Sequence, residues 1–126
     1  MLGDAFLYAT VPASDLQRAR RFYEEKLGLQ PVDDSPEDVF YGGKDGTRIL
    51  VFASSGAASG THTQVGLSVA DIAAEVAELR ARGVVFEEYD EPGLKSVDGI
   101  ADMGTVKAAW FHDSEGNLLG VVEIAD

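Results

Sequence analysis

The sequence predicts an α+β fold made of two tandem β-α-β-β-β modules. A strand, a capped helix, a glycine stop and a glycine-turn hairpin follow one another in the same order in both halves of the chain. A run of small and polar residues separates the halves. At 126 residues the chain has the size of one domain. We therefore expect a single domain, 1–126, with modules 1–55 and 62–126 joined by a linker at 54–61.

The first module begins with a β-favouring stretch from Phe6 to Val11, which we expect to end at Pro12 because proline lacks a ladder N–H. A capping-box pattern at Ser14 then predicts a helix, and Gly28 supplies its left-handed stop. Three further strands are predicted, the last two flanking a glycine-rich turn, at 29–32, 39–41 and 48–52.

The same pattern starts again after the linker. It predicts a strand at 63–69, a helix at 71–82 that Gly83 ends, a strand at 84–88, and hairpin strands at 106–111 and 118–124. The 15 residues from 90 to 104 hold three glycines and one proline, which is typical of a long loop. This loop, with Met103 near its end, is expected either to cover the mouth of a cavity or to pack on its rim.

The two halves also align residue by residue. Tyr8 aligns with Gln64 at an offset of 56 residues, and later Phe40 aligns with Trp110 at an offset of 70. Two hairpins could resemble each other by chance, but the shared order of elements favours an internal duplication.

Composition limits the classes of partner. The chain has 10 Lys and Arg against 22 Asp and Glu, a net charge of −12, so phosphate backbones and anionic lipids would repel it. We expect neither nucleic acid nor membrane as a partner. The absence of cysteine excludes disulfides, thiolate metal sites and a cysteine nucleophile. Without an apolar run long enough for a membrane span or a signal peptide, the chain is expected to be cytoplasmic.

Several motifs carry a family resemblance: Val11-Pro-Ala-Ser-Asp-Leu, Phe22-Tyr23, Leu27-Gly28-Leu29, Val69-Ala-Asp-Ile, and Trp110-Phe-His-Asp-Ser-Glu-Gly-Asn117. With these the chain resembles the vicinal oxygen chelate family, also described as the glyoxalase, bleomycin-resistance and dioxygenase superfamily. Ser114 and Glu115 stand where the family's turn usually has Pro and Asp. The resemblance implies a curled mixed sheet around an open cavity. Because many members dimerise so that modules of two chains meet, it also implies a homodimer.

The resemblance further implies where metal ligands would lie, on the first and last strand of each module. Those positions hold Tyr8, Leu50, Gln64 and Gly120. Leucine and glycine offer no donor side chain, and tyrosine and glutamine are weak ligands. We therefore expect no metal and no cofactor, while the cavity itself is retained.

Other residues are open to two interpretations. Trp110 and Phe40 either wall the cavity or fill the core, depending on which face of their strand they occupy. His62 is either an exposed residue after the linker or a displaced ligand or base beside Gln64. No catalytic residue is assigned. The candidate ligand-binding residues are Tyr8, Phe40, Leu50, His62, Gln64, Met103, Trp110 and Gly120.

These observations favour a metal-free protein that binds a small molecule and sequesters a hydrophobic or aromatic compound, either a drug or a natural product. The alternative is a lyase, isomerase or dioxygenase-like enzyme. It would use a metal held by an unusual set such as His62 and Glu123, or no metal, with Tyr8 and Gln64 as polar handles. A third interpretation is a scaffold whose cavity is closed by side-chain packing.

Overall fold

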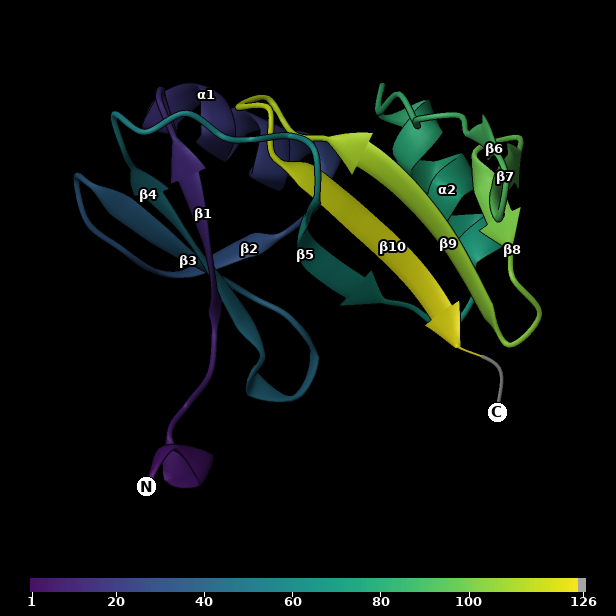
Figure 1. The fold of residues 1–126 in the computed structure, drawn as a ribbon. Coiled ribbons are helices and arrows are strands. Elements are labelled where there is room, and N and C mark those ends of the chain that lie inside the picture. Colours follow the sequence, from purple (N-terminus) through teal and green to yellow (C-terminus); the bar gives the residue numbers. More distant parts are fainter. Residues whose placement is uncertain (125–126) are drawn as a thin grey trace.

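The computed structural model describes residues 1–124 and contains two mixed β-sheets with helices beside them (Figure 1). The first sheet has the strand order β1-β4-β3-β2, with β1 parallel and β2 antiparallel to their neighbours. Its module consists of η1 (Leu2–Asp4), β1 (Ala9–Ala13), α1 (Leu16–Arg21), the π-helical turn η2 (Phe22–Lys26), β2 (Gln30–Asp34), β3 (Asp38–Gly42), η3 (Lys44–Gly46) and β4 (Arg48–Ala53).

The second sheet has the order β5-β10-β9-β8-β7-β6. Strand β5 is parallel to β10, and the remaining neighbours are antiparallel. This module consists of β5 (Thr63–Ser68), α2 (Ile72–Ala81), β6 (Asp90–Glu91), β7 (Leu94–Val97), β8 (Ile100–Asp102), β9 (Val106–His112) and β10 (Leu118–Ile124). Within residues 1–124 no helix is long and apolar enough to cross a bilayer.

The strand registers repeat between the two sheets. Ala9 pairs with Ile49 in the first sheet, and the residues aligned with them, Val65 and Leu119, pair in the second. In the hairpins, Phe40 pairs with Leu50, and Trp110 pairs with Gly120 at the same offset of 70 residues. The duplicated β-α-β-β-β order predicted from the sequence is therefore present in the fold.

One hydrophobic core joins the helices to one face of each sheet. Tyr23 stacks on Tyr41 of the first sheet at 5.6 Å between ring centroids, and its neighbour Phe22 lies 6.3 Å from Phe111 of the second. Strand residues that point toward this core are almost fully buried, among them Val11, Val39, Val51, Phe111, Leu119 and Val121. Because side chains alternate along a strand, the other face of each sheet is turned away from the core.

The first helix begins one residue later than predicted. Asp15 is the N-cap, and its carboxylate accepts from the Arg18 N–H at 3.1 Å. The capping box at Ser14 was wrong, because the Ser14 hydroxyl donates instead to Glu115. Gly28 has a φ of 70° and follows the helical segment, as predicted.

The first strand also differs from its prediction. It begins at Ala9 rather than Phe6 and runs through Pro12 to Ala13. Proline did not end the strand because β1 lies at the edge of its sheet, where a missing N–H is tolerated.

The segment between α2 and β9 departs most from the sequence analysis. The expected strand at 84–88 is reduced to an isolated bridge between Phe86 and Phe111. The expected loop at 90–104 forms β6, β7 and β8, which extend the second sheet past β9. Asp98 and Gly99, with φ of 52° and 82°, form the tight turn between β7 and β8. The segment therefore continues the sheet as strands and is not a long loop.

The turn after β9 fastens the second module to the first. Asp113 accepts from the Tyr23 hydroxyl at 2.6 Å, and the Asn117 amide donates to the carbonyl of Pro12 at 2.9 Å. Glu115, whose side chain is 1% exposed, accepts from the Arg18 guanidinium at 2.7 Å. The hydrogen bonds from Arg18 lower the pKa of Glu115 to about 2, against the opposing effect of burial.

Candidate functional site

Two groups of aromatic side chains lie on the sheet faces that are turned away from the core. In the first sheet, Phe40 lies between the buried Val39 and Tyr41 and is only partly buried. In the second, Trp110 is partly buried, while Phe111 next to it is in the core. Both aromatic residues thus occupy the strand face away from the helices.

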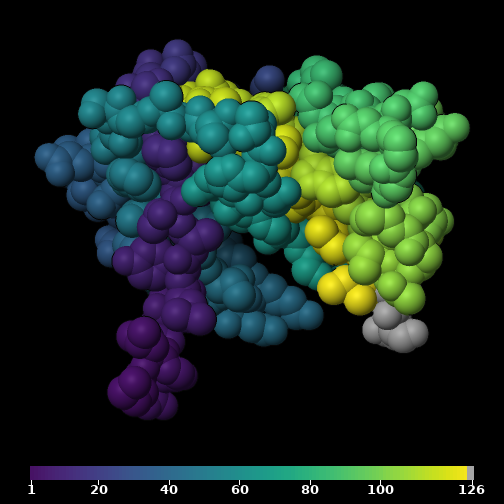
Figure 2. All heavy atoms as spheres, in the orientation of Figure 1, coloured from purple at the N-terminus to yellow at the C-terminus, as the bar shows by residue number. Residues whose placement is uncertain are grey.

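The group on the first sheet, the Phe40 face, consists of Phe6, Tyr8, Phe40, Arg48 and Leu50. Tyr8 meets Phe40 edge to face at 5.1 Å between ring centroids. The guanidinium carbon of Arg48 lies 5.6 Å from the ring centroid of Phe6 and 6.0 Å from that of Phe40. Phe6 and Tyr8 come from the N-terminal segment that projects from the body of the molecule (Figure 2), and they are 59% and 47% exposed.

The group on the second sheet, the Trp110 face, consists of Thr63, Tyr89, Trp110 and Gly120. Tyr89 meets Trp110 edge to face at 5.4 Å, and the indole N–H donates to the Thr63 hydroxyl at 3.2 Å. A Cβ on Gly120 would lie 3.2 Å from the indole nitrogen and 3.3 Å from Cγ2 of Thr63. The indole therefore covers the place where a side chain at 120 would project.

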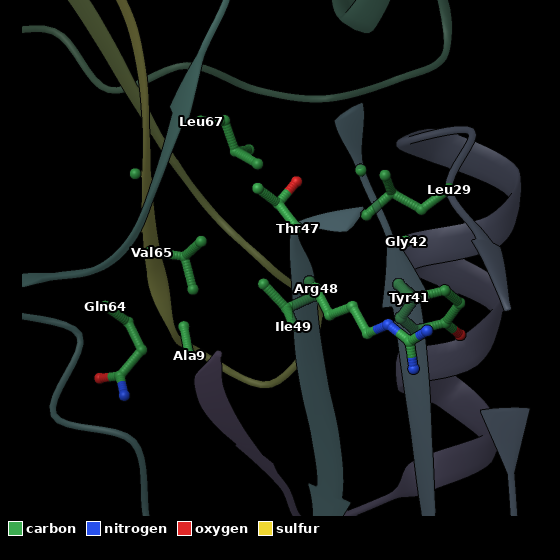
Figure 3. Close-up of a pocket in the computed structure, with 12 residues that line it drawn as sticks. Ala9, Leu29, Tyr41, Gly42, Thr47, Arg48, Ile49, Gln64, Val65 and Leu67 are labelled. Atoms are coloured by element: carbon green, nitrogen blue, oxygen red, sulfur yellow. The ribbon is translucent and has the colours of Figure 1, made fainter. Parts of the chain in front are cut away.

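Between the modules lies a groove of about 240 Å³. Figure 3 shows its walls, with Gln64, Val65 and Leu67 of β5 on one side. Opposite them lie Tyr41 of β3, Thr47 just before β4, and Arg48 and Ile49 of β4. A smaller groove of about 160 Å³ shares Leu29 and Leu67 with it and reaches Phe111. Neither groove is lined by Phe40 or Trp110.

The predicted site residues are therefore distributed over several places. Tyr8, Phe40 and Leu50 lie on the Phe40 face, and Trp110 and Gly120 lie on the Trp110 face. Gln64 lines the larger groove. The two remaining candidates, His62 and Met103, belong to neither face nor to these grooves.

His62 and Met103 have surroundings of their own. The His62 ring lies 2.9 Å from the Ser59 hydroxyl within the exposed linker. Met103 is half exposed in the turn between β8 and β9. Residues 90–104, which were expected to be a loop that either covers a cavity or packs on its rim, form strands instead.

The positions where the family resemblance implies metal ligands do not suit a metal. The Gln64 side-chain amide donates to the carbonyl of Thr10 at 3.0 Å, and Gly120 is covered by the indole of Trp110. Leu50 has no donor atom, and Tyr8 offers a single phenol oxygen, which is a weak ligand. In the described part of the chain, no three His, Cys, Asp or Glu side chains are grouped so that they could hold an ion. These residues do not fit a metal.

His112 holds the linker against the second module. One ring nitrogen lies 3.0 Å from the Gly60 carbonyl and the other 2.8 Å from a Glu87 carboxylate oxygen. Both partners accept hydrogen bonds, so together they favour the doubly protonated ring. The Gly60 carbonyl, followed by Glu87, raises the pKa of His112.

Sequence analysis missed four members of these faces: Phe6, Arg48, Thr63 and Tyr89. Arg48 could have been found, because it precedes Leu50 by two residues and two residues is the period of a strand face. Tyr89 had no such signal, because it lies outside the strands, where side chains do not alternate regularly. Its ring contacts Trp110 only because the chain after Phe86 runs beside β9.

Paired β-α-β-β-β modules with a shared core define the class to which this chain belongs. The model of the Glyoxalase/Bleomycin resistance protein/Dioxygenase superfamily matches residues 5–121, so the chain belongs to this superfamily. A comparison of its sequence with curated proteins found no match.

Solved structures share this fold at low sequence identity. UcmS2 has a TM-score of 0.75 and 22% identity, and the match covers 94% of this chain and 97% of that one. TnmS3, an antibiotic binding protein from Streptomyces sp. CB03234, has a TM-score of 0.69 and 22% identity, covering 97% and 98%. A superfamily protein from Alicyclobacillus acidocaldarius has a TM-score of 0.72 and 19% identity, covering 98% and 93%.

Proposed function

We propose that this chain is a metal-free binding protein that sequesters a hydrophobic or aromatic small molecule, acting as a homodimer in the cytoplasm. The observation that carries the proposal is the pair of aromatic faces turned away from the core, in place of a metal-binding set of donors. Aromatic rings with partly exposed surfaces are well suited to hold a planar apolar molecule.

The grooves between the modules are less suitable. The larger one measures about 240 Å³, whereas pockets for drug-sized ligands have about 300 to 1,000 Å³. Two of its polar side chains are also engaged, since Gln64 donates to Thr10 and Tyr41 donates to Glu24. A ligand would find more free aromatic surface on the two outer faces.

A second copy of the chain would complete the site. Among residues 1–124, Phe40 and Trp110 line neither groove between the modules, and many members of the superfamily bring modules of two chains together. In a symmetric pair, the Phe40 face of one copy can lie opposite the Trp110 face of the other, which forms two equivalent sites. The exposed apolar side chains of Leu2, Phe6 and Leu7 would be covered by the same contact.

The named ligand class of one structural neighbour agrees with this proposal. TnmS3 is described as an antibiotic binding protein, and at 22% identity it shares the fold over nearly the whole chain. A bulky natural product or drug is therefore the kind of molecule to screen first.

Trp110 gives a direct test because it is the only tryptophan in the chain. A library of planar apolar compounds should contain ligands that quench its fluorescence and raise the melting temperature, equally with and without divalent metals. Trp110→Ala should weaken such a ligand about tenfold or more. Met103→Ala, at an exposed turn away from both faces, is the control that should keep full affinity.

Sedimentation of the unliganded protein tests whether it forms the proposed homodimer. A dimer is expected at micromolar concentration. A folded Trp110→Ala variant with undiminished affinity, or a monomer that binds the same compounds as tightly, would contradict the proposed site.

A further inference from the structure

We infer that Arg48 makes the Phe40 face selective for aromatic anions, so that the sequestered molecule is a planar aromatic compound carrying a carboxylate or phenolate. This inference rests on the proposed function and narrows its ligand class. Its basis is the surroundings of one guanidinium group, that of Arg48, over the aromatic rings of this face.

The contacts of Arg48 differ from those of the ion-paired arginines. Arg18, Arg20 and Arg82 each lie within 3.0 Å of a carboxylate oxygen. Among residues 1–124 Arg48 has no such ion pair, although acidic residues outnumber basic ones by 22 to 10. Its guanidinium carbon lies instead over the rings of Phe6 and Phe40, at 5.6 and 6.0 Å.

This placement leaves the hydrogen-bond donors of Arg48 available. A guanidinium that contacts aromatic rings through its flat face keeps its N–H groups in the plane, where a carboxylate can accept two of them at once. The same aromatic rings offer apolar surface to the flat part of a ligand. Arg48 and the rings beside it can thus bind the charged group and the flat apolar part of an aromatic anion.

A second free donor lies beside the same ring. The Tyr8 ring contacts Phe40, and within the described residues its hydroxyl donates to no protein acceptor. The hydroxyls of Tyr23 and Tyr41, in contrast, donate to Asp113 and Glu24. An oxyanion on the Phe40 face could therefore accept from both Arg48 and Tyr8.

The positive charge of Arg48 favours an anionic ligand on the Phe40 face. With a net charge of −12, the protein as a whole repels anions, so an anion needs a specific cation at short range. Arg48 supplies that cation at the aromatic surface itself. A neutral or cationic aromatic compound that covered the guanidinium would leave it without an acceptor.

Three probes of the same shape test the inference by calorimetry: 2-naphthoate, 2-naphthalenemethanol and 2-naphthylmethylammonium. Wild-type protein should bind the carboxylate about 10 to 100 times more tightly than the alcohol, and the ammonium most weakly. Arg48→Gln should abolish the preference for the carboxylate. Arg48→Lys keeps the charge without the planar donors and should retain only part of it.

Lys44→Gln is the matched control. Lys44 is exposed in the turn just before β4, so this variant removes one positive charge nearby and leaves the aromatic contacts intact. It should keep the full preference for the carboxylate. Thermal melting of each variant confirms that it is folded before its affinity is compared.

The outcomes separate the two levels of the proposal. If the alcohol binds wild-type protein as tightly as the carboxylate, the inference is overturned and the proposed function stands. If none of the probes binds the folded protein, both fail. If Arg48→Gln dissociates the dimer and naphthoate affinity follows only the dimer fraction, Arg48 holds the second copy instead, and the inference is overturned.

Discussion

The carboxylate of Glu115 provides a quantitative test of how the two modules are held together. It accepts hydrogen bonds from the Arg18 guanidinium, the Ser14 and Ser114 hydroxyls and the backbone N–H of Asp15, and its side chain is 1% exposed. Glu115→Gln keeps the shape of the side chain and removes its charge. The variant therefore measures the contribution of the charge.

The size of the effect follows from the pKa. A fall of the Glu115 pKa from 4.5 to about 2 corresponds to an upper limit of about 3 to 4 kcal/mol of folding stability. Because Arg18 is 47% exposed and partly screened by water, we expect Glu115→Gln to cost about 2 kcal/mol at pH 7.

The pH dependence has a defined sign. The folded pKa is depressed, so this stabilisation is fully present above pH 4.5 and is lost as the pH falls toward 2. Urea unfolding of both proteins between pH 7 and pH 2.5 should show a stability difference that shrinks across this window. A difference that stays constant with pH would refute the assignment of the pKa shift to folded-state contacts.

Glu78→Gln is the control for an exposed ion pair. Glu78 lies 3.0 Å from Arg82, but the two side chains are 60% and 43% exposed. Its loss should cost less than about 0.5 kcal/mol. If it costs as much as the loss of Glu115, burial is not the reason for the strength of the Glu115 contacts.

Three further substitutions test neighbouring contacts. Gly120→Ala places a Cβ 3.2 Å from the indole nitrogen of Trp110 and should shift the tryptophan emission without unfolding the protein; an unchanged spectrum would contradict the close packing. Tyr23→Phe removes the 2.6 Å hydrogen bond to Asp113 and should cost about 1 to 3 kcal/mol in urea unfolding, whereas a neutral result would show that this bond contributes no net stability. His112→Ala should speed proteolysis of the linker at pH 6. Because the His112 pKa is raised, its stabilisation is present below pH 6.5 and is lost as the pH rises, so the difference should shrink by pH 8; equal cleavage at pH 6 would contradict the contact.

The duplicated architecture could be predicted because its signals are local. A helix stop such as Gly28, or the aligned pair Phe40 and Trp110, depends on a few neighbouring residues and on strand alternation. Because side chains alternate along a strand, Trp110 could point only toward the helices or away from them. In the structure it lies on the face away from the helices.

The errors arose where tertiary pairing decided the structure. Residues 90–104 look like a loop by composition, but β8 pairs with β9 and turns the segment into strands. The dipeptide Asp98-Gly99 was a hairpin signal that could have indicated this. Pro12 was treated as a strand end because edge and centre positions cannot be distinguished without the strand order.

The site was harder to predict than the fold, because its geometry depends on how the modules pack. Sequence reasoning expected Tyr8, Gln64 and Trp110 to converge on one cavity. In the structure Phe22 and Tyr23 lie between the inner faces of the two sheets, so the outer faces point away from this shared core. No local pattern in the sequence specifies which face of a module its partner module will cover.

The turn at residues 113–117 has a consequence for the order of folding. Its contacts to the first module join residues 90 to 105 positions apart, from Tyr23 with Asp113 to Pro12 with Asn117. Contacts of such long range slow the folding of a chain because a large loop must close before they form. During synthesis, Arg18 and Tyr23 would therefore acquire their acidic partners only after residues 113–117 have left the ribosome. The two modules, although copies of one pattern, should consequently fold as one cooperative unit.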